Sequence, residues 1–306
     1  LYSLIHTFRS AEFKFHLMKR STVQNKSKSN FVNMGPIRLR QPLPSLQIND
    51  VDPFILLHHY GPYQINSESN PFDLGPHPHR GFEPITLLVQ GEQLHRDSLG
   101  NHSVVKAGDV QWTTAGKGIV HAEGPTKDFV KKGGVLEGIQ LWLNLPSSHK
   151  MMEPAYQHIR HEEMPVIESD ASKISIKVVA GIYKGAKGEI KTQTPVNVLW
   201  GVSKASGSAS IDIAQGHQAL VYLIKGKLRI NDSEVLEDDG TKMIVFNNDG
   251  DHFLLQSEED SVFLVLTGTP LEEKVVSYGP FVMNSQQEIQ QALVDYQQGK
   301  MGFVKK

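Results

Sequence analysis

Short runs of apolar and β-branched residues, separated by glycine, proline, asparagine and aspartate, dominate the chain from about residue 35 onward. Such runs are typical of strands in antiparallel sheets. Turn signals lie between them, for example Leu99-Gly100-Asn101 and Ala107-Gly108-Asp109. The pattern therefore predicts an antiparallel sandwich or barrel. In the first half of the chain the predicted strands are 84–90, 103–107, 109–114, 118–123 and 137–145.

The alternation is lost over residues 149–170, which are rich in charge and proline, and a second set of β runs follows. The stretches LLVQGEQLHR and YLIKGKLRIN superimpose on Gly91 and Gly226, each with an apolar run, a glycine and a polar run. A duplicated barrel explains this match. We expect a basic, flexible segment at 1–34, an N-terminal barrel at 35–148, a linker at 149–170, a C-terminal barrel at 171–283, and a helix with a tail at 284–306.

The last part of the chain has apolar residues at helical spacing. Ile289, Leu293 and Tyr296 recur every three or four residues, and Ser285 before them is a suitable N-cap. The sequence therefore predicts an all-β protein with a short C-terminal helix.

The charge distribution limits the classes of partner. A net charge of −2 argues against a polyanion-binding surface along the whole chain. Eight basic residues stand against one acidic residue, Glu12, in the first forty, so we expect no nucleic-acid partner beyond weak contact through this segment. No apolar run reaches the roughly 18 residues of a membrane span. Glu12 and Lys14 interrupt any secretory h-region, so we expect no cleaved secretory signal. We interpret residues 1–17 as leader sequence before a natural start at Met18. We expect a cytoplasmic protein without a membrane partner.

The candidate chemistry depends on histidine. The chain has no cysteine and 14 histidines, which leaves nitrogen and oxygen as the strong metal ligands. His77-Pro78-His79 and His121-Ala122-Glu123 share one format, and alternate residues of a strand point to the same face. One such pair is often a surface or core feature, but two in the same β unit predict a transition-metal site, because calcium and magnesium prefer oxygen ligands.

Several longer motifs resemble one family. HPHRGFE (77–83), GDVQWTTAGKGIVHAE (108–123), QLWLNLP (140–146) and DPFILLHHYGP (52–62) resemble the pirin family of the cupin superfamily, and GPFVMNSQQEIQQALVDYQQGKMG resembles its closing segment. The resemblance implies two tandem cupin (jelly-roll type) β-barrels with one metal, usually iron, in the N-terminal barrel. The implied ligands are His77, His79, His121 and Glu123.

A second carboxylate competes with Glu123 for the metal. In general cupins the glutamate of the first motif, here Glu83, often ligates the ion. Pirin-type sites use the later carboxylate, and the shared strand face of His121 and Glu123 agrees with this choice. We expect Glu83 to hydrogen-bond to an imidazole instead.

The other histidines have simpler interpretations. His58 and His59 are expected to pack or to form hydrogen bonds, and His95 and His102 flank a turn. His158 and His161 could form a helical metal pair with Glu162, although a solvated face is the interpretation we favour. In the second β unit, superposition on Gly226 leaves the histidine pair without a counterpart, so that unit is expected to be free of metal. The residues opposite His77, His79 and Glu83 are Asp212, Ala214 and Gln218.

Four protein ligands leave two positions of an octahedral ion open, which suits a substrate together with O₂. The resemblance implies cleavage of flavonols such as quercetin by a 2,3-dioxygenase reaction, with Fe(II) as the expected ion and Mn, Ni, Cu, Co or Zn as alternatives. Glu123 is the candidate proton acceptor. The alternative is a redox-responsive, metal-binding regulatory protein that binds a protein partner without turnover. Structural zinc is disfavoured because such sites are usually closed and cysteine-rich. Candidate pocket residues are Phe72, Trp112, Gln140 and Trp142.

Overall fold

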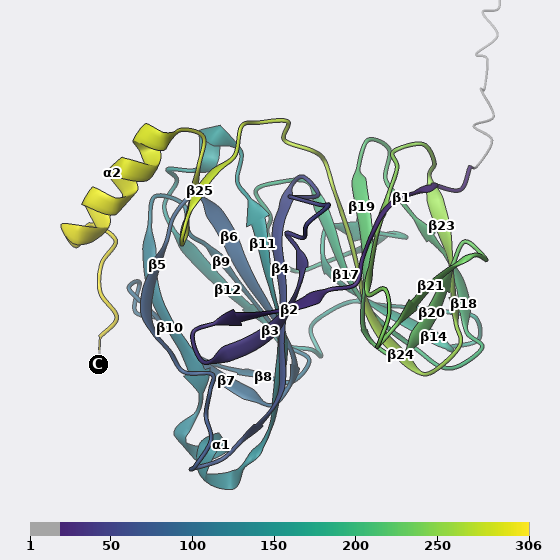
Figure 1. The fold of residues 1–306 in the computed structure, drawn as a ribbon, viewed down its shortest axis with the longest axis horizontal. Coiled ribbons are helices and arrows are strands. Elements are labelled where there is room, and N and C mark those ends of the chain that lie inside the picture. Colours follow the sequence, from purple (N-terminus) through teal and green to yellow (C-terminus); the bar gives the residue numbers. More distant parts are fainter. Residues whose placement is uncertain (1–18, 306) are drawn as a thin grey trace, which may run out of the picture.

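Two β-barrels lie side by side in the computed structural model, which describes residues 19–305 (Figure 1). The larger sheet of the first barrel has seven antiparallel strands. In sheet order these are β12 (Ala155–Ile159), β9 (Val110–Thr114), β6 (Phe82–Gln90), β11 (Gly134–Asn144), β4 (Phe54–Ile65), β3 (Ile37–Leu43) and β2 (Asn30–Met34). Its smaller sheet holds β5 (Leu74–His79), β10 (Ile119–Pro125), β7 (Glu92–Asp97) and β8 (His102–Lys106).

The second barrel repeats this arrangement strand for strand, and the predicted all-β class with tandem barrels is confirmed. Its larger sheet holds β1 (Val23–Ser27), β22 (Met243–Phe246), β19 (Gln218–Lys225), β24 (Ser261–Gly268), β17 (Val196–Ser203), β14 (Ile174–Ala180) and β13 (Val166–Ser169). Its smaller sheet holds β18 (Ser208–Asp212), β23 (His252–Ser257), β20 (Lys227–Ile230) and β21 (Glu234–Glu237). A short ribbon, β15 (Ile182–Tyr183) with β16 (Ala186–Lys187), follows β14.

The glycines that suggested the repeat occupy equivalent turns. Gly91 joins β6 to β7 with a φ of +91°, and Gly226 joins β19 to β20 with a φ of +98°. A side chain at either position would also collide with backbone, since a Cβ would lie 2.6 Å from the carbonyl oxygen of Val135 or 2.5 Å from that of Asp260. Glycine is therefore required in both turns.

Apolar side chains fill the second barrel and the contact between the barrels. One core cluster crosses this contact and includes Leu57 and Trp112 of the first barrel and Trp200 and Leu264 of the second. Another cluster lies in the second barrel and includes Phe253 and Leu255. The shared cluster fixes the two barrels against each other.

The boundaries expected at the N-terminus and the linker need correction. Residues 1–18 lie outside the described residues, but the expected flexibility is wrong for 23–34. β1 pairs with β22 of the second barrel, and β2 pairs with β3 of the first. The segment expected to be a linker, 149–170, instead contains two strands, because β12 extends the first barrel and β13 extends the second. The physical reason is that unpaired backbone groups of an edge strand favour an added strand, even a polar one.

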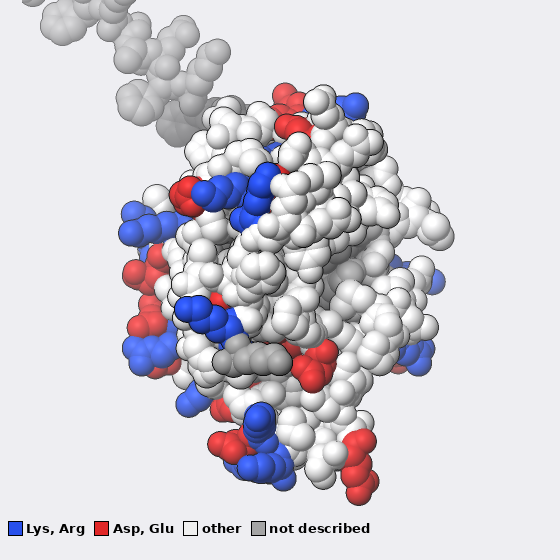
Figure 2. Space-filling view, turned by 90° about the vertical axis from the view of Figure 1, so that its left-hand side faces the viewer, with Lys and Arg blue, Asp and Glu red and all other residues white. Residues whose placement is uncertain are grey.

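The C-terminal segment returns to the first barrel. β25 (Val276–Tyr278), β26 (Phe281–Met283) and α2 (Gln286–Gln297), followed by residues to 302, form what we call the C-terminal strap. The predicted helix is confirmed, with Ser285 Oγ accepting a hydrogen bond from the backbone N–H of Glu288. The expected end of the second barrel at 283 is wrong, because Phe281 forms a bridge to Arg80 of the first barrel. On the side of the molecule that carries α2, charged side chains lie mostly at the margins (Figure 2).

Two short helices flank β11 in the sequence: α1 (Lys127–Lys132) precedes it and the 3₁₀ helix at Ser147–His149 follows it. Among residues 19–305 no helix is both long enough and apolar enough to cross a bilayer.

Candidate metal centre

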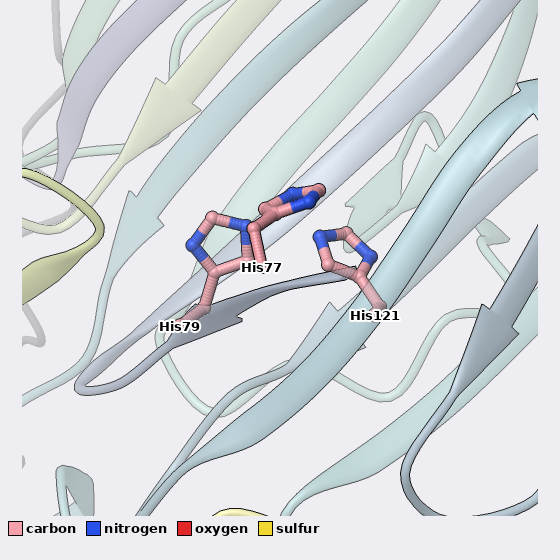
Figure 3. A group of neighbouring side chains, drawn as sticks. All are labelled: His77, His79 and His121. Atoms are coloured by element: carbon pink, nitrogen blue, oxygen red, sulfur yellow. The ribbon is translucent and has the colours of Figure 1, made fainter. Parts of the chain in front are cut away.

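Three imidazoles converge inside the first barrel (Figure 3). β5 and β10 are antiparallel neighbours, and their register places His77 opposite His121 and His79 opposite Ile119. The potential ligand atoms of His77, His79 and His121 all lie within 4.8 Å of one another. The strand alternation that suggested a shared face therefore brings these three residues together, and we call them the histidine cluster.

The protonation of these rings suits metal ligation. His77 Nδ1 lies 2.8 Å from the carbonyl oxygen of Gly75, to which it donates, so Nε2 carries the free lone pair. Burial, together with neighbouring imidazoles, holds the pKa of His79 and of His121 well below its usual range. These two rings are therefore neutral at physiological pH and can act as ligands.

Several buried nitrogens of the cluster lack protein partners. Among the described residues, Nδ1 of His79 and both ring nitrogens of His121 form no hydrogen bond. A buried polar group without a partner costs about 1–3 kcal/mol. A transition metal bound by these imidazoles satisfies lone pairs that the protein leaves unmatched, so the residues present fit such an ion.

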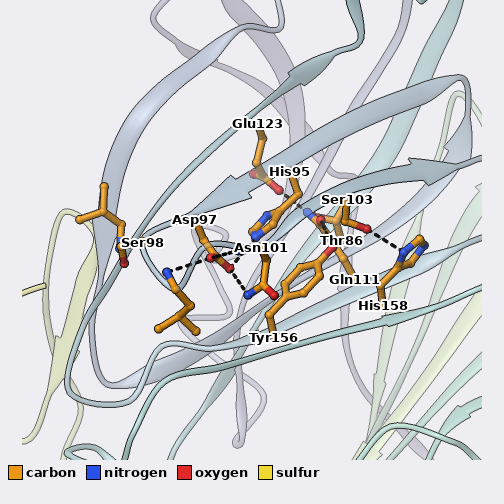
Figure 4. Close-up of polar contacts among 12 residues, drawn as sticks. Thr86, His95, Asp97, Ser98, Asn101, Ser103, Gln111, Glu123, Tyr156 and His158 are labelled. Carbon is orange, nitrogen blue, oxygen red and sulfur yellow. Dashed lines mark hydrogen bonds and ion pairs between the residues drawn. The ribbon is translucent and has the colours of Figure 1, made fainter. Parts of the chain in front are cut away.

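Glu123 lies beside His121 on β10, and two amides orient its carboxylate, of which Figure 4 shows that of Gln111. Its Oε1 accepts a hydrogen bond from Gln93 Nε2 at 3.1 Å and another from Gln111 Nε2. Within the described part of the chain, Oε2 has no hydrogen-bond partner. The ligand atoms of Glu123, His95 and His121 lie within 4.8 Å of one another, so the carboxylate is on the His121 side of the cluster.

Two tyrosines fix the amides that hold Glu123. The Tyr60 hydroxyl donates to Gln93 Oε1 at 2.9 Å, and the Tyr156 hydroxyl donates to Gln111 Oε1 at 3.3 Å. Each glutamine must therefore direct its NH₂ group toward the carboxylate. This layer of hydrogen bonds sets the orientation of Glu123 in the way that outer residues orient the ligands of metal sites.

His95 is a site residue that the sequence interpretation missed. It is fully buried, its Nε2 lies 3.0 Å from Asp97 Oδ2, and its ring stacks on Tyr156 at 4.2 Å. Burial raises the pKa of Asp97, but hydrogen bonds from His95 and Asn101 outweigh this effect and hold it below its usual range. The available signal was the spacing of His95 and Asp97, which, like the two ligand pairs, places both side chains on one strand face.

A cavity of about 490 Å³ opens beside the histidine cluster. The structure places Phe72, Gln140 and Trp142 in its wall, together with His77, His79 and Glu123. Trp112, the other candidate for the wall, is instead fully buried in the core shared by the barrels. The alternation of side chains along β9 explains the difference, because it turns Trp112 toward the face of the sheet that packs in this core.

Glu83 lies apart from the histidine cluster. Its register partner on β11 is Leu143, a core residue, and the carboxylate accepts a hydrogen bond from Thr114 Oγ1 at 2.6 Å. The expected hydrogen bond to an imidazole is therefore wrong. Burial raises the pKa of Glu83 to about 7.

Three other histidines, His59, His158 and His161, link segments of the chain. His158 lies on β12 and His161 in the following turn, so the two do not form the helical pair that the sequence analysis disfavoured, and both lie near Asp109. The ligand atoms of Asp109, His161 and Glu162 lie within 4.8 Å of one another, and the last two residues are exposed. At the contact between the barrels, His59 bonds to Glu137 and Tyr222, as the sequence interpretation expected of a structural histidine.

Known proteins share this fold over most of the chain. The chain is 38% identical over 251 residues to a Pseudomonas aeruginosa protein that carries quercetin 2,3-dioxygenase in its name, covering 82% of this chain and 86% of the relative. The crystal structure of quercetin 2,3-dioxygenase from Acinetobacter baumannii superimposes with a TM-score of 0.87 at 37% identity, over 94% of this chain and 100% of that one. A nickel(II) complex of the Escherichia coli pirin YhhW has the same fold, with a TM-score of 0.63 at 18% identity, over 80% of this chain and 98% of that one.

Two tandem barrels, the first holding a histidine-lined cavity, define a bicupin. The Pirin family matches residues 36–143, and the Pirin C-terminal cupin domain matches residues 202–302. The chain therefore belongs to the pirin family, and the resemblance noted in the sequence is confirmed.

Proposed function

We propose that this protein is an iron-dependent dioxygenase that cleaves flavonols such as quercetin. The observation that carries the proposal is the histidine cluster, in which His79 and His121 have buried nitrogens without protein partners, beside a cavity of about 490 Å³ whose wall includes His77, His79 and the carboxylate of Glu123. The names of the relatives from Pseudomonas aeruginosa and Acinetobacter baumannii support the same reaction class.

In this proposal His77, His79, His121 and Glu123 hold one divalent transition metal, Fe(II). When bound, such an ion supplies Lewis acidity toward a coordinated hydroxyl and a place for O₂. Since Oε1 of Glu123 accepts two amide hydrogen bonds, Oε2 is the oxygen left for the metal or for a proton.

The protein's own residues position the substrate and move its proton. Trp142 and Phe72 offer aromatic surface for a flat ring system, and the apolar wall limits the access of water. Glu123 accepts the proton of the flavonol 3-hydroxyl, and Gln93 and Gln111 keep its carboxylate in position. The electron-rich flavonol anion then reacts with O₂ in the cavity.

The test begins with protein purified without oxygen, whose metal content is measured before any assay. Iron-loaded protein is then mixed with a panel of flavonols, and O₂ uptake is followed between pH 6 and 9, about the range in which a metal-bound hydroxyl ionises. We expect uptake with flavonols and none with a flavone that lacks the 3-hydroxyl.

If fully iron-loaded protein shows no flavonol-dependent O₂ uptake, the dioxygenase proposal fails, and the alternative, a metal-dependent regulatory protein that binds a protein partner without turnover, takes its place. Turnover far below the roughly 1–10³ per second typical of enzymes would show that quercetin-like compounds are surrogates for another substrate.

A further inference from the structure

A row of polar side chains begins in the otherwise largely apolar wall of the cavity, where His58 and Gln140 lie, and continues into buried positions. Leu56 and Trp142 belong to the apolar part of this wall. His58 on β4 lies opposite Gln140 on β11, and Gln140 lies opposite Thr86 on β6. Side chains directly opposite each other on neighbouring strands share a face and lie close together. The row is therefore a product of strand register.

The row ends at the carboxylate of the metal centre. Thr86 lies opposite Gln111 on β9, and Gln111 Nε2 donates both to Thr86 Oγ1, at 3.0 Å, and to Glu123. Strands lie about 4.8 Å apart, so Gln111 and His58, three strands from each other, are separated by roughly 14 Å along the sheet. A ligand that reaches from the Glu123 end to His58 is therefore elongated.

The hydrogen bonds around His58 determine which nitrogen is its acceptor. Gln41 Nε2 donates to the carbonyl oxygen of Pro44 at 2.9 Å, which directs Gln41 Oε1 toward His58. His58 Nε2, 2.9 Å from that oxygen, must therefore carry the proton. Burial lowers the pKa of His58 to about 4, so the ring is neutral at physiological pH. Its Nδ1 has no hydrogen-bond partner among residues 19–305 and remains an acceptor in a side chain that lines the cavity.

We propose that His58 determines substrate specificity by accepting, through Nδ1, a hydrogen bond from a hydroxyl group at the end of the substrate remote from the histidine cluster. The side chains described as lining the cavity include no lysine or arginine, which favours a neutral hydroxylated aromatic compound over a carboxylate or phosphate ester. The proposal rests on the proposed function, because it takes the cavity as the site of an aromatic substrate.

The experiment measures binding without turnover. Protein loaded with Zn(II) under nitrogen is titrated with 3-hydroxyflavone and with its 4′-hydroxy and 7-hydroxy derivatives, which place one added hydroxyl at opposite ends of the molecule. We expect the wild type to bind one of the two derivatives about tenfold more tightly than 3-hydroxyflavone, or about 1.4 kcal/mol, as for one hydrogen bond between neutral groups.

The variants test whether His58 provides this preference. We expect His58→Phe to remove it while changing the Kd of 3-hydroxyflavone less than about twofold, and His58→Gln, which keeps an acceptor oxygen, to retain part of it. The matched control is Asp73→Asn, at an exposed carboxylate that also lines the cavity. Thermal unfolding of each variant verifies its fold.

Two results would overturn the assignment to His58: an unchanged preference in His58→Phe, or loss of the preference in Asp73→Asn. If the probes bind with the expected preference but the iron-loaded protein takes up no O₂, the dioxygenase proposal fails and the role of His58 stands. If the iron-loaded protein takes up O₂ but His58→Phe keeps the preference, the dioxygenase proposal stands and the role of His58 fails. If the wild type binds none of the probes, both proposals fail.

Discussion

The two barrels share one strand order, but different residues occupy their smaller sheets. In the first barrel, β5 and β10 direct His77, His79 and His121 inward. The equivalent strands of the second barrel, β18 and β23, contribute Ile211, Phe253 and Leu255 to an apolar core instead. The same topology therefore supports a polar cavity in one copy and a filled core in the other.

This difference has an energetic consequence. Apolar side chains buried in the second barrel stabilise it directly, at roughly 25 cal/mol per Å² of surface removed from water. The first barrel instead buries imidazole nitrogens without protein partners, which is unfavourable unless a ligand binds them. We expect metal binding to stabilise the first barrel and to have little effect on the second.

The largest expected effect comes from removing two imidazoles of the first barrel. The wild type should bind one transition-metal ion per chain, and His77→Ala combined with His121→Ala should bind none. Elemental analysis after dialysis measures this stoichiometry. Loss of two of the three clustered imidazoles should weaken affinity at least about 10³-fold, since outer-shell changes alone cost 10- to 100-fold.

The paired control for this change lies in the second barrel. Asp212→Ala with His252→Ala removes two residues that lie opposite each other on β18 and β23, and it should leave one metal per chain. Two metals in the wild type, or one metal retained by the His77 and His121 double variant, would contradict the comparison between the barrels.

The next effect separates proton transfer from ligation. Glu123→Gln should reduce turnover about 10³-fold, because an amide cannot accept the proton, while the three imidazoles still hold the ion. Metal content and the rate of O₂ uptake, measured on the same sample, provide the two readouts. Equal loss of both would show that Glu123 is only a ligand. Glu83→Gln is the control. If Glu83→Gln abolished metal binding and Glu123→Gln did not, Glu83 would be the carboxylate ligand in place of Glu123.

The features predicted correctly depend on local periodicity and on motifs. Strand alternation was enough to place His77, His79 and His121 on one face, and helical spacing after Ser285 was enough to identify α2. Gly91 and Gly226 identified the duplication because both turns require a positive φ. These features are encoded within a few residues of chain.

The features missed depend on long-range pairing. β1 is polar and basic, and only the free edge of β22, more than 200 residues away, makes it a strand. His95 lies next to a turn in the sequence, yet its strand faces the cluster once β7 pairs with β10. Trp112 and Glu83 lie on strands whose inward and outward faces both border a packed layer, so alternation alone could not exclude them from the cavity.

A third change tests whether the second barrel is structural. Phe253→Ala deletes a fully buried ring from the second barrel and should destabilise the protein by about 3 kcal/mol, as large-to-small core changes do. Metal stoichiometry and affinity should stay at wild-type values. Chemical denaturation gives the stability, and a metal titration gives the affinity. A parallel loss of metal affinity would mean that the second barrel supports the site of the first.

The smallest expected effect concerns the C-terminal strap, which covers the first barrel and has no counterpart on the second among residues 19–305. Arg80, adjacent to His79, is buried and donates to Asp295 Oδ2 on α2 at 2.9 Å. Asp295→Asn removes the charge that pairs with this guanidinium and should cost about 2 kcal/mol, typical of a hydrogen bond between charged groups. Thermal unfolding measures this loss, and Gln290→Ala on an exposed position of the same helix is the matched control.

The pH dependence supplies an independent check on this pair. A hydrogen bond from Lys300, with others from Gln291 and Arg80, lowers the pKa of Asp295 to about 2. A carboxylate whose pKa is depressed in the folded state stabilises that state above its unfolded pKa, near 4, and loses the contribution as the pH falls toward 2. The difference in stability between wild type and Asp295→Asn should therefore be constant from pH 5 to 7 and shrink between about pH 4 and 2. A difference that persists unchanged at pH 2 would show that the substitution acts through packing of α2, and that the ion pair does not hold the strap against the metal barrel.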